Sequence, residues 1–314
     1  MTLTEFKYIV AVAREHHFGR AAESCFVSQP TLSVAIRKLE EELGVVLFER
    51  GGNEVTVTSA GAPIVAQAQR VLDEAAQIKE LAKAGRDPLA GALRVGVIYT
   101  ISPYLLPSLV RQLLHDAPQM PLVLNENFTI KLLELLKTGE IDVAIVALPL
   151  PETGMLIQPL YDEPFMIAVP RNHAWSKRAS VASEELKNET MLLLGAGHCF
   201  RDHVLSVCPE MSRFASAAEG IQKTFEGSSL ETIRYMVASG LGVTVMPRLS
   251  VPEQIARDSL IEYLPFKGVA PDRRVVLAWR RSFTRPQAIA ALAQAILKCP
   301  LPGVQKLDER PQAH

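Results

Sequence analysis

The sequence predicts an α/β protein made of a small helical unit, one long helix and a larger unit of alternating strands and helices. Residues 1–58 combine helical spacing of apolar residues with two turn signals and a closing hairpin pattern. Residues 58–84 carry apolar positions at heptad spacing, and from Gly91 onward short apolar runs alternate with helical patterns. The chain has 314 residues, enough for two or three modules with separate hydrophobic cores.

The first 58 residues predict a helix-turn-helix followed by a β-hairpin wing. One helix runs past Phe6, a second begins at Phe18, and a third begins after Ser28 and ends at Gly44. Residues 47–50 and 55–57 flank a turn and predict the hairpin. Two short helices joined in this way are typical of a DNA reader. The candidate DNA contacts are Arg20, Ser28, Gln29, Pro30, Thr31, Ser33, Arg37 and Arg50.

Bulk charge gives this unit no support as a DNA reader. Through Thr58 there are six Lys and Arg residues against eight Asp and Glu residues. Affinity would then depend on the direction of the basic side chains, with Glu40–Glu42 turned away from phosphate. A three-helix core without DNA-binding function remains the alternative.

Residues 58–84 predict a long helix that requires a partner. Apolar residues recur at steps of three and four from Ile64 to Ala82, with Ser59 as a candidate cap and Gly85 as a stop. A helix of about 26 residues is roughly 39 Å long. A dimer is expected, because a lone helix would leave this seam exposed.

The larger unit predicts an α/β fold with largely parallel sheets. The strand candidates are Leu93–Val97, Leu122–Leu124, Ile141–Ala147, Phe165–Val169, Met191–Leu194, Val243–Met246 and Val275–Trp279. Thr100 and Thr129 follow the first two, and ligands gather beyond the carboxyl ends of such strands. Simple helix capping is the alternative role for these hydroxyls.

Cys199 and Cys208 stand nine positions apart in a predicted helical segment. A helix would separate their Cα atoms by roughly 13 Å, whereas a disulfide tolerates about 7 Å. Cys199 follows a glycine-rich turn, where helix amides favour an anion, and His198 and Arg201 add positive charge or hydrogen bonds. The pair could therefore form a switch. Two reduced cysteines that merely pack are the alternative.

Composition limits the remaining possibilities. The chain is 48% hydrophobic and 21% charged with a formal net charge of -1, which is typical of a globular protein. No apolar run reaches membrane-spanning length and no signal pattern opens the chain, so a cytoplasmic location without membrane contact is expected. Cysteine and histidine spacing predicts no metal site and no cofactor. Cys25 and Cys299 receive no role.

The sequence resembles the LysR-type transcriptional regulators over nearly its whole length. The N-terminal motifs that carry the resemblance are Phe18-Gly-Arg-Ala-Ala, Val27-Ser-Gln-Pro-Thr-Leu-Ser, Ile36-Arg-Lys-Leu-Glu, Leu43-Gly-Val-Val-Leu-Phe-Glu-Arg and Val57-Thr-Ser-Ala-Gly. Within the family, Gly197-His-Cys-Phe-Arg-Asp together with Cys208 resembles the peroxide-responsive OxyR group. The wing is less basic than is usual for the family.

This resemblance implies a domain order. A winged helix-turn-helix would span residues 1–58 and a linker and dimerisation helix 59–87. A periplasmic-binding-protein-like regulatory domain of two α/β subdomains would span 88–300, with a flexible tail at 301–314.

The resemblance also implies a function. A homotetramer would bind double-stranded promoter DNA and act with RNA polymerase in oxidative-stress defence. Hydrogen peroxide would oxidise Cys199 to a sulfenic acid that Cys208 condenses into a disulfide, which a thiol reductant resets. The residues that would surround the peroxide are Thr100, Thr129, His198 and Arg201, with Arg274 nearby.

Two other functions remain open. A related regulator could bind a small metabolite in the cleft between subdomains, with the cysteines as passengers. A thiol peroxidase enzyme would need sustained turnover, and a long dimerising helix with a DNA reader fits that class poorly. The sequence therefore favours a regulator that is not an enzyme.

Overall fold

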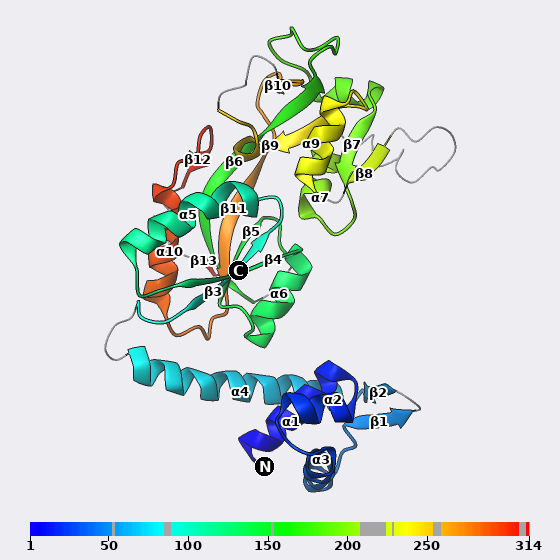
Figure 1. The fold of residues 1–314 in the computed structure, drawn as a ribbon, viewed down its shortest axis with the longest axis vertical. Coiled ribbons are helices and arrows are strands. Elements are labelled where there is room, and N and C mark those ends of the chain that lie inside the picture. Colours follow the sequence, from blue (N-terminus) through cyan, green and yellow to red (C-terminus); the bar gives the residue numbers. More distant parts are fainter. Residues whose placement is uncertain are drawn as a thin grey trace. The chain divides into compact units, whose positions relative to one another are not determined.

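The computed structural model describes residues 1–51, 54–84, 89–151, 154–207, 224–227, 229–253, 259–307 and 312–313 (Figure 1). The chain forms two compact units, Met1–Asp87 and Pro88–His314. Each unit is described by itself.

The first unit has the predicted helix-turn-helix and hairpin. Its elements are α1 Leu3–Glu15, α2 Phe18–Ser24, α3 Gln29–Leu43, β1 Phe48–Gly51, β2 Glu54–Val57 and α4 Gly61–Ala84. Local sequence sets the helix ends. Thr2 and Glu5 form a capping box at α1, Ser28 caps α3, and Gly44 ends α3 with a φ of 66°. The three helices close over a core that includes Ile9, Leu32 and Ile36, all fully buried.

Helix α4 begins slightly differently from the sequence prediction. The hydroxyl of Thr58 accepts the amide of Gly61 at 2.8 Å, so Thr58 rather than Ser59 supplies the side-chain oxygen at this end. Ala68 is buried against the core of the first unit, with Ile64 and Val65 packed beside it. Ile78, further along the predicted seam, is 68% exposed.

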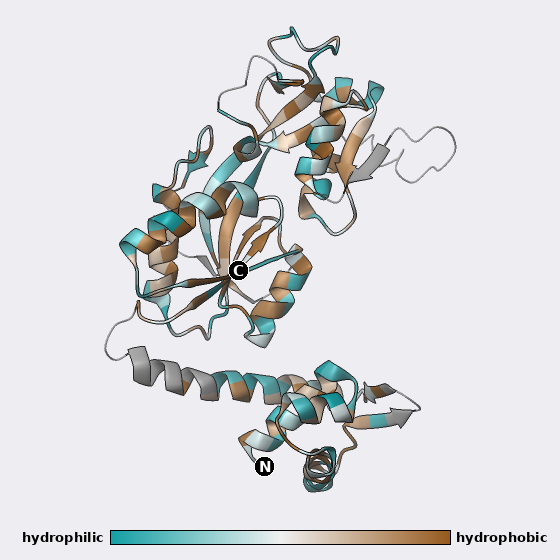
Figure 2. Cartoon of the chain, in the orientation of Figure 1, coloured by the Kyte–Doolittle hydropathy of each residue, from teal (hydrophilic) through white to brown (hydrophobic). Residues whose placement is uncertain are grey.

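The second unit contains two hydrophobic cores, and we call the elements around them the first and second lobes. The first lobe has the strand order β6-β11-β5-β3-β4, with bounds β3 Leu93–Ile98, β4 Leu122–Asn127, β5 Val143–Ala147, β6 Leu156–Pro170 and β11 Asp272–Trp279. Helices α5 Ser102–Asp116, α6 Thr129–Thr138 and α10 Pro286–Lys298 complete it. Figure 2 shows the hydrophobic character of its central strands.

The second lobe is built on the carboxyl half of β6. There β6 pairs with β9 Thr244–Pro247 and β10 Ile261–Pro265, while β7 Met191–Leu194 pairs with β8 Thr224–Gly227. Its helices are α7 Cys199–Val207 and α9 Leu230–Ala238, with short 3-10 turns at Ser183–Asn188 and Arg248–Ser250.

The prediction of largely parallel sheets is wrong. Strand β3 is parallel to β4 and β5, and β7 to β8, but β6, β9, β10 and β11 pair in antiparallel fashion. The reason is β6, which runs 15 residues through both lobes although the sequence predicts only Phe165–Val169 as a strand.

Residues 301–307 also differ from the expected flexible tail. Strand β12 Gln305–Lys306 pairs with β6, and the Leu307 amide donates to the Leu160 carbonyl oxygen. The short β13 Gln312–Ala313 also pairs with β6.

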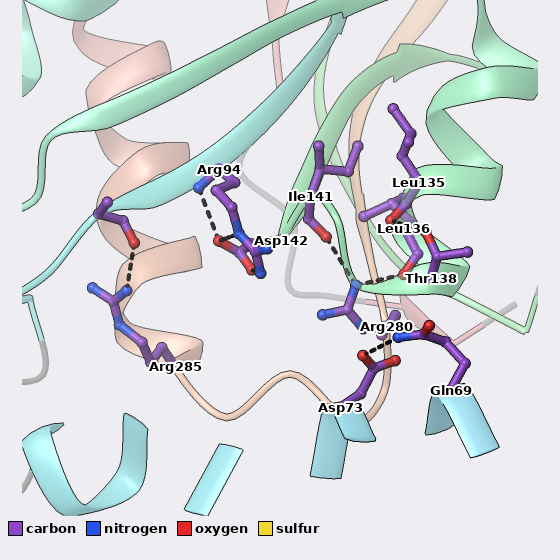
Figure 3. Close-up of polar contacts among 11 residues, drawn as sticks. Gln69, Asp73, Arg94, Leu135, Leu136, Thr138, Ile141, Asp142, Arg280 and Arg285 are labelled. Atoms are coloured by element: carbon purple, nitrogen blue, oxygen red, sulfur yellow. Dashed lines mark hydrogen bonds and ion pairs between the residues drawn. The ribbon is translucent and has the colours of Figure 1, made fainter. Parts of the chain in front are cut away.

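Arginines fix the first lobe at the ends of its strands opposite Thr100. Arg94 Nη2 donates to Asp142 at 2.7 Å, and Arg280 Nη1 donates to the carbonyl oxygens of Leu136 and Ile141 (Figure 3). Arg285 Nη1 donates to the carbonyl oxygen of Ala92. These contacts hold the start of β3 and the end of β11. The site lies at the other end of the sheet, beyond the carboxyl end of β3.

Among the described helices, none is long and apolar enough to cross a bilayer.

Candidate functional site: a thiol pocket and a helix-turn-helix surface

A small pocket lies where three strand-to-helix connections meet. The turns after β3 and β4 come from the first lobe, and the turn after β7 comes from the second. The lining residues are Ile98, Tyr99, Thr100, Asn127, Phe128, Thr129, Gly197, His198 and Cys199. The sequence candidates Thr100, Thr129, His198 and Cys199 are therefore brought together, at the carboxyl ends of strands where ligands usually bind.

Thr100 is fixed by a buried arginine. Arg273 Nη1 donates to Thr100 Oγ1 at 2.7 Å, and Arg273 Nη2 donates to the Thr100 carbonyl oxygen at 3.0 Å. Arg273 is paired with Glu163 at 2.8 Å, and both side chains are almost completely buried. The Glu163 carboxylate also accepts the amide of Leu249. Because the Thr100 hydroxyl accepts from Arg273, its own proton is directed elsewhere and can serve a ligand.

Thr129 differs from Thr100 because no described residue forms a hydrogen bond with its hydroxyl. The residue is 6% exposed, and its Oγ1 makes no hydrogen bond within the described part of the chain. Leaving a buried hydroxyl unsatisfied costs about 1–3 kcal/mol. Thr129 opens α6, whose N-cap residue Phe128 provides no side-chain cap bond. A small polar ligand in the pocket would satisfy this hydroxyl.

Cys199 forms the opposite wall as the first residue of α7. The turn before it contains Gly197 with a φ of 96°, a conformation that favours glycine. A Cβ at Gly197 would lie 3.4 Å from the Phe128 ring, so the turn also packs closely on the first lobe. Cys199 is half-buried, and it forms no disulfide with another described cysteine. The sulfur therefore lies at the N-terminal end of α7, on the wall of the pocket.

Three rings enclose the pocket. His198 is 8% exposed and packs edge-on against Phe128 and Tyr99, with centroids 4.8 and 5.9 Å away. Tyr99 and Phe128 are 5.3 Å apart and each 38% exposed. The rings thus line the pocket together with Cys199, and part of the Tyr99 and Phe128 surface meets solvent.

The pocket admits only a very small molecule. The space open to the centre of a water-sized molecule is about 10 Å³, which is close to the minimum for one water. Sites for organic ligands usually measure about 300–1,000 Å³. In the residues that the structure describes, no group of three or more His, Cys, Asp or Glu side chains is placed to hold a metal ion.

Two candidate residues lie differently from the prediction. Arg274 points away from the pocket into an ion pair with Asp162 at 2.8 Å, with 43% of its side chain exposed. Its neighbour Arg273 holds the site instead, because adjacent residues of β11 face opposite sides. Arg201 Nη1 donates to the Leu194 carbonyl oxygen at 2.9 Å. This contact closes the turn between β7 and α7, and Arg201 is not among the pocket-lining residues.

Residues missed by the sequence analysis include Arg273 and Glu163. Arg273 also stacks over the Phe200 ring of α7 at 5.2 Å. The sequence contains one indication of Arg273, the two adjacent residues Arg273 and Arg274 directly before the predicted strand Val275–Trp279. Nothing in the sequence indicated a partner 110 positions away.

The other cysteines are placed as follows. Cys208 lies outside the described residues, although α7 is helical up to Val207, directly before it. Cys299 is buried, donates to the Ala295 carbonyl oxygen, and has its pKa raised by burial, which keeps the thiol protonated and inert. Cys25 is half-buried in the first unit, where it lines a hollow of about 480 Å³ between α1, α2 and Leu72.

The first unit presents the candidate DNA-contacting residues on the helix-turn-helix. Gln29, Pro30, Thr31 and Arg37 are exposed on α3, and Ser33 is half-buried. Ser28 caps α3 and shares a hydrogen bond with the Thr31 hydroxyl at 2.8 Å. Exposure leaves the first turn of α3 open to a partner, while the buried Leu32 and Ile36 hold the helix on its core.

Charged side chains of this unit also bond to its own backbone. Arg20 is exposed, and its Nη2 donates to the Glu15 carbonyl oxygen at 2.7 Å. Glu40 accepts the amides of Leu47 and Phe48, so this carboxylate anchors the hairpin. Arg50 lies in β1, but its side chain is outside the described part.

Family models match both units. The bacterial regulatory helix-turn-helix protein of the lysR family matches residues 3–62, and the LysR substrate binding domain matches residues 86–298. The chain belongs to the LysR family. Its fold is therefore a helix-turn-helix joined to a LysR substrate-binding domain with mixed α/β sheets.

Relatives within the LysR family are similar over almost the whole chain. The "Hydrogen peroxide-inducible genes activator" of Pectobacterium carotovorum is 42% identical over 280 residues, 89% of this chain and 90% of that protein. The "DNA-binding transcriptional dual regulator OxyR" of Escherichia coli is 40% identical over 296 residues, 94% of this chain and 95% of that protein.

Solved structures are similar as well. A full-length Pseudomonas aeruginosa OxyR carrying a cysteine-to-aspartate substitution has a TM-score of 0.77 and 53% identity, covering 95% of this chain and 98% of that one. A hydrogen peroxide-bound cysteine mutant of Corynebacterium glutamicum OxyR has a TM-score of 0.63 and 34% identity, covering 95% and 92%.

Proposed function

We propose that this LysR-family chain is a DNA-binding transcriptional regulator that senses hydrogen peroxide through Cys199. The observation that carries the proposal is the pocket itself. The Cys199 thiol and the buried Thr129 hydroxyl, which has no hydrogen-bond partner among the described residues, line one space that holds about one water molecule. The names of the relatives, hydrogen peroxide-inducible genes activator and OxyR, support the same function.

The chemistry uses both walls of the pocket. Peroxide can donate to and accept from the Thr100 and Thr129 hydroxyls, which orients one oxygen toward the Cys199 sulfur. The thiolate attacks that oxygen, the O–O bond breaks, and the departing hydroxide takes up a proton to leave as water. The sulfur retains one oxygen as a sulfenic acid. Attack by the Cys208 thiol then forms the disulfide and releases a second water.

The second step requires α7 to change shape. From Cys199 to Val207 the helix rises roughly 12 Å, and Cys208 follows directly. A disulfide requires Cα atoms within about 7 Å. Unwinding α7 links oxidation of one sulfur to a rearrangement of the second lobe, which gives peroxide a means to alter DNA binding.

The wider assembly belongs to the same proposal. The chain acts as a cytoplasmic homotetramer on double-stranded promoter DNA, contacts RNA polymerase, and is reset by a thiol reductant. The winged helix-turn-helix spans residues 1–58, the linker helix 59–87 and the regulatory domain 88–300. The DNA-contacting residues are those of the α3 face together with Arg20 and Arg50.

Regulation by a metabolite is the second candidate, and pocket size argues against it at this site. The Cys199 pocket is far smaller than typical sites for organic ligands. A peroxidase enzyme would need repeated turnover with a reductant. One oxidation per chain, as a switch requires, distinguishes the regulator from that enzyme.

Mass spectrometry of the peroxide-treated protein tests the proposal. Stoichiometric peroxide should produce a disulfide between Cys199 and Cys208 in the wild type, and Cys199→Ser should abolish it. Cys299→Ser is a matched control that should leave the disulfide intact, because the Cys299 thiol is buried away from the pocket. A wild type that stays reduced while promoter output responds to peroxide would contradict the thiol switch. Calorimetric binding of an organic acid, unaffected by Cys199→Ser, would favour the metabolite alternative.

A further inference from the structure

His203 forms a direct hydrogen bond between the two lobes. Its Nε2 lies 2.7 Å from the carbonyl oxygen of Leu148, which packs on the core of the first lobe. A carbonyl oxygen only accepts, so Nε2 must carry the proton. The other ring nitrogen, Nδ1, is buried without a hydrogen-bond partner in the described ranges, which fits a bare lone pair.

Cys199 and His203 lie on the same side of α7. Residues four apart on a helix are neighbours on one face. Cys199 packs against the core of the first lobe, and His203 bonds to that lobe through Leu148. Phe200 and Val204 belong instead to the core of the second lobe. Helix α7 therefore presents one face to each lobe, with the reactive thiol and His203 together.

The surroundings of His203 keep the ring uncharged. It lies 6.2 Å from the Phe165 ring and 6.5 Å from the Phe200 ring, centroid to centroid. Burial lowers the pKa of the imidazole. The charged groups acting on it are Arg273 of β11, which opposes protonation, and Asp202 of α7, which favours it. A neutral ring is less costly to bury than a charged one, and the bond from Nε2 to the Leu148 carbonyl oxygen gives the contact its direction.

We propose that His203 is a positioning residue that docks α7 on the first lobe and so holds Cys199 in the pocket until oxidation. This inference rests on the proposed peroxide function. The bond to Leu148 lies one helical turn from Cys199, in the part of α7 that must unwind before Cys208 can reach the sulfenic acid. The same contact therefore aids the first step and opposes the second.

Two substitutions separate the effect of the His203–Leu148 hydrogen bond, here called the tie, from the effect of packing. His203→Gln places an amide N–H near the position of Nε2 and can still donate to the Leu148 oxygen. His203→Phe keeps the ring volume beside Phe165 and Phe200 but has no donor. The first step is measured alone in a Cys208→Ser background, as the rate of oxygen addition to Cys199. The second is measured as disulfide formation after a peroxide pulse.

The tie predicts opposite changes in the two steps. His203→Phe should slow peroxide addition about fivefold and accelerate disulfide formation about fivefold, corresponding to the loss of one ordinary hydrogen bond. His203→Gln should restore both rates toward the wild type. Equal behaviour of the two variants, or a Phe variant with both rates unchanged, would overturn the proposal.

Amide hydrogen exchange on the reduced full-length chain provides a readout independent of peroxide. His203→Phe should increase exchange within α7, and His203→Gln should not. If α7 responds in this way but the wild type forms no disulfide, the tie stands and the peroxide function fails. If the disulfide forms but exchange is the same in all three proteins, the function stands and the tie is refuted.

Discussion

The two walls of the Cys199 pocket are held in different ways. The first wall presents Thr100 and Thr129 from turns that follow β3 and β4, in a lobe whose sheet is tied by a fully buried arginine. The second wall is a nine-residue helix that follows a glycine turn and reaches the first lobe through the His203 contact. One wall is built to stay fixed and the other can be rebuilt, which is the division that a redox switch requires.

The largest expected effect concerns the fixed wall and comes from comparing two adjacent arginines. Arg273→Leu leaves the Glu163 carboxylate buried without its partner, and should lower the free energy of unfolding by about 3–5 kcal/mol. Arg274→Leu breaks a partly exposed ion pair with Asp162 and should cost about 0–1 kcal/mol. Urea denaturation of the regulatory unit within the full chain measures both. Equal losses would mean that Arg273 is not the anchor of this wall.

A change outside both walls should leave the pocket untouched. Arg37 is exposed on α3, so Arg37→Ala should weaken promoter binding by about 1–3 kcal/mol if the guanidinium reads a base, in reduced and oxidised protein alike. Fluorescence anisotropy at several salt concentrations measures the change. Peroxide reactivity should remain that of the wild type. An altered rate of Cys199 oxidation would contradict the separation of the reader from the pocket.

Thr129 tests the ligand-facing side of the fixed wall. Thr129→Val removes a hydroxyl that has no partner in the described part of the chain, so stability should not fall. Peroxide addition should slow about tenfold through loss of one hydrogen bond to the reacting molecule. Stopped-flow kinetics and thermal unfolding measure the two effects. Thr138→Val is the matched control on α6, because its hydroxyl bonds to the Leu135 carbonyl oxygen away from the pocket. It should lower stability without changing the rate. The reverse result would assign Thr129 a structural role.

The smallest expected effect concerns pH and the movable wall. Burial holds the pKa of His203 below its ordinary value of 6.5, so a released ring binds a proton more readily than a docked one. The neutral His203 ring therefore makes its full contribution to the docking of α7 above about pH 6.5, and this contribution decreases as the pH falls below that value. Hydrogen exchange of α7, corrected for intrinsic pH dependence, should rise on acidification in the wild type. His203→Gln should not show that rise, and a parallel response in both proteins would exclude His203 as its source.

The same contrast explains how much the sequence could predict. The helix-turn-helix was predictable because its ends are set locally, by Ser28 before α3 and Gly44 after it. Thr100, Thr129 and Cys199 were predictable because each follows a strand and stands near the start of a helix. These positions depend on neighbours in the chain.

The features that were missed depend on distant partners. Pro159 and Pro164 concealed the 15-residue β6, since proline argues against a central strand. The apolar run Val275–Trp279 has no alternation, so it could not show whether Arg273 or Arg274 faces inward. The contact of His203 with Leu148 spans 55 positions and appears only in the folded chain.

Peptide mapping of the Cys208→Ser variant after one equivalent of peroxide tests the central claim most directly. We predict one added oxygen atom on Cys199, captured by a sulfenic-acid trapping reagent, with Cys25 and Cys299 unmodified. Combining this variant with Thr129→Val should reduce the modified fraction at early times. Oxidation spread over the three cysteines, or a Cys199 that remains a thiol, would contradict a pocket built to deliver peroxide to this sulfur.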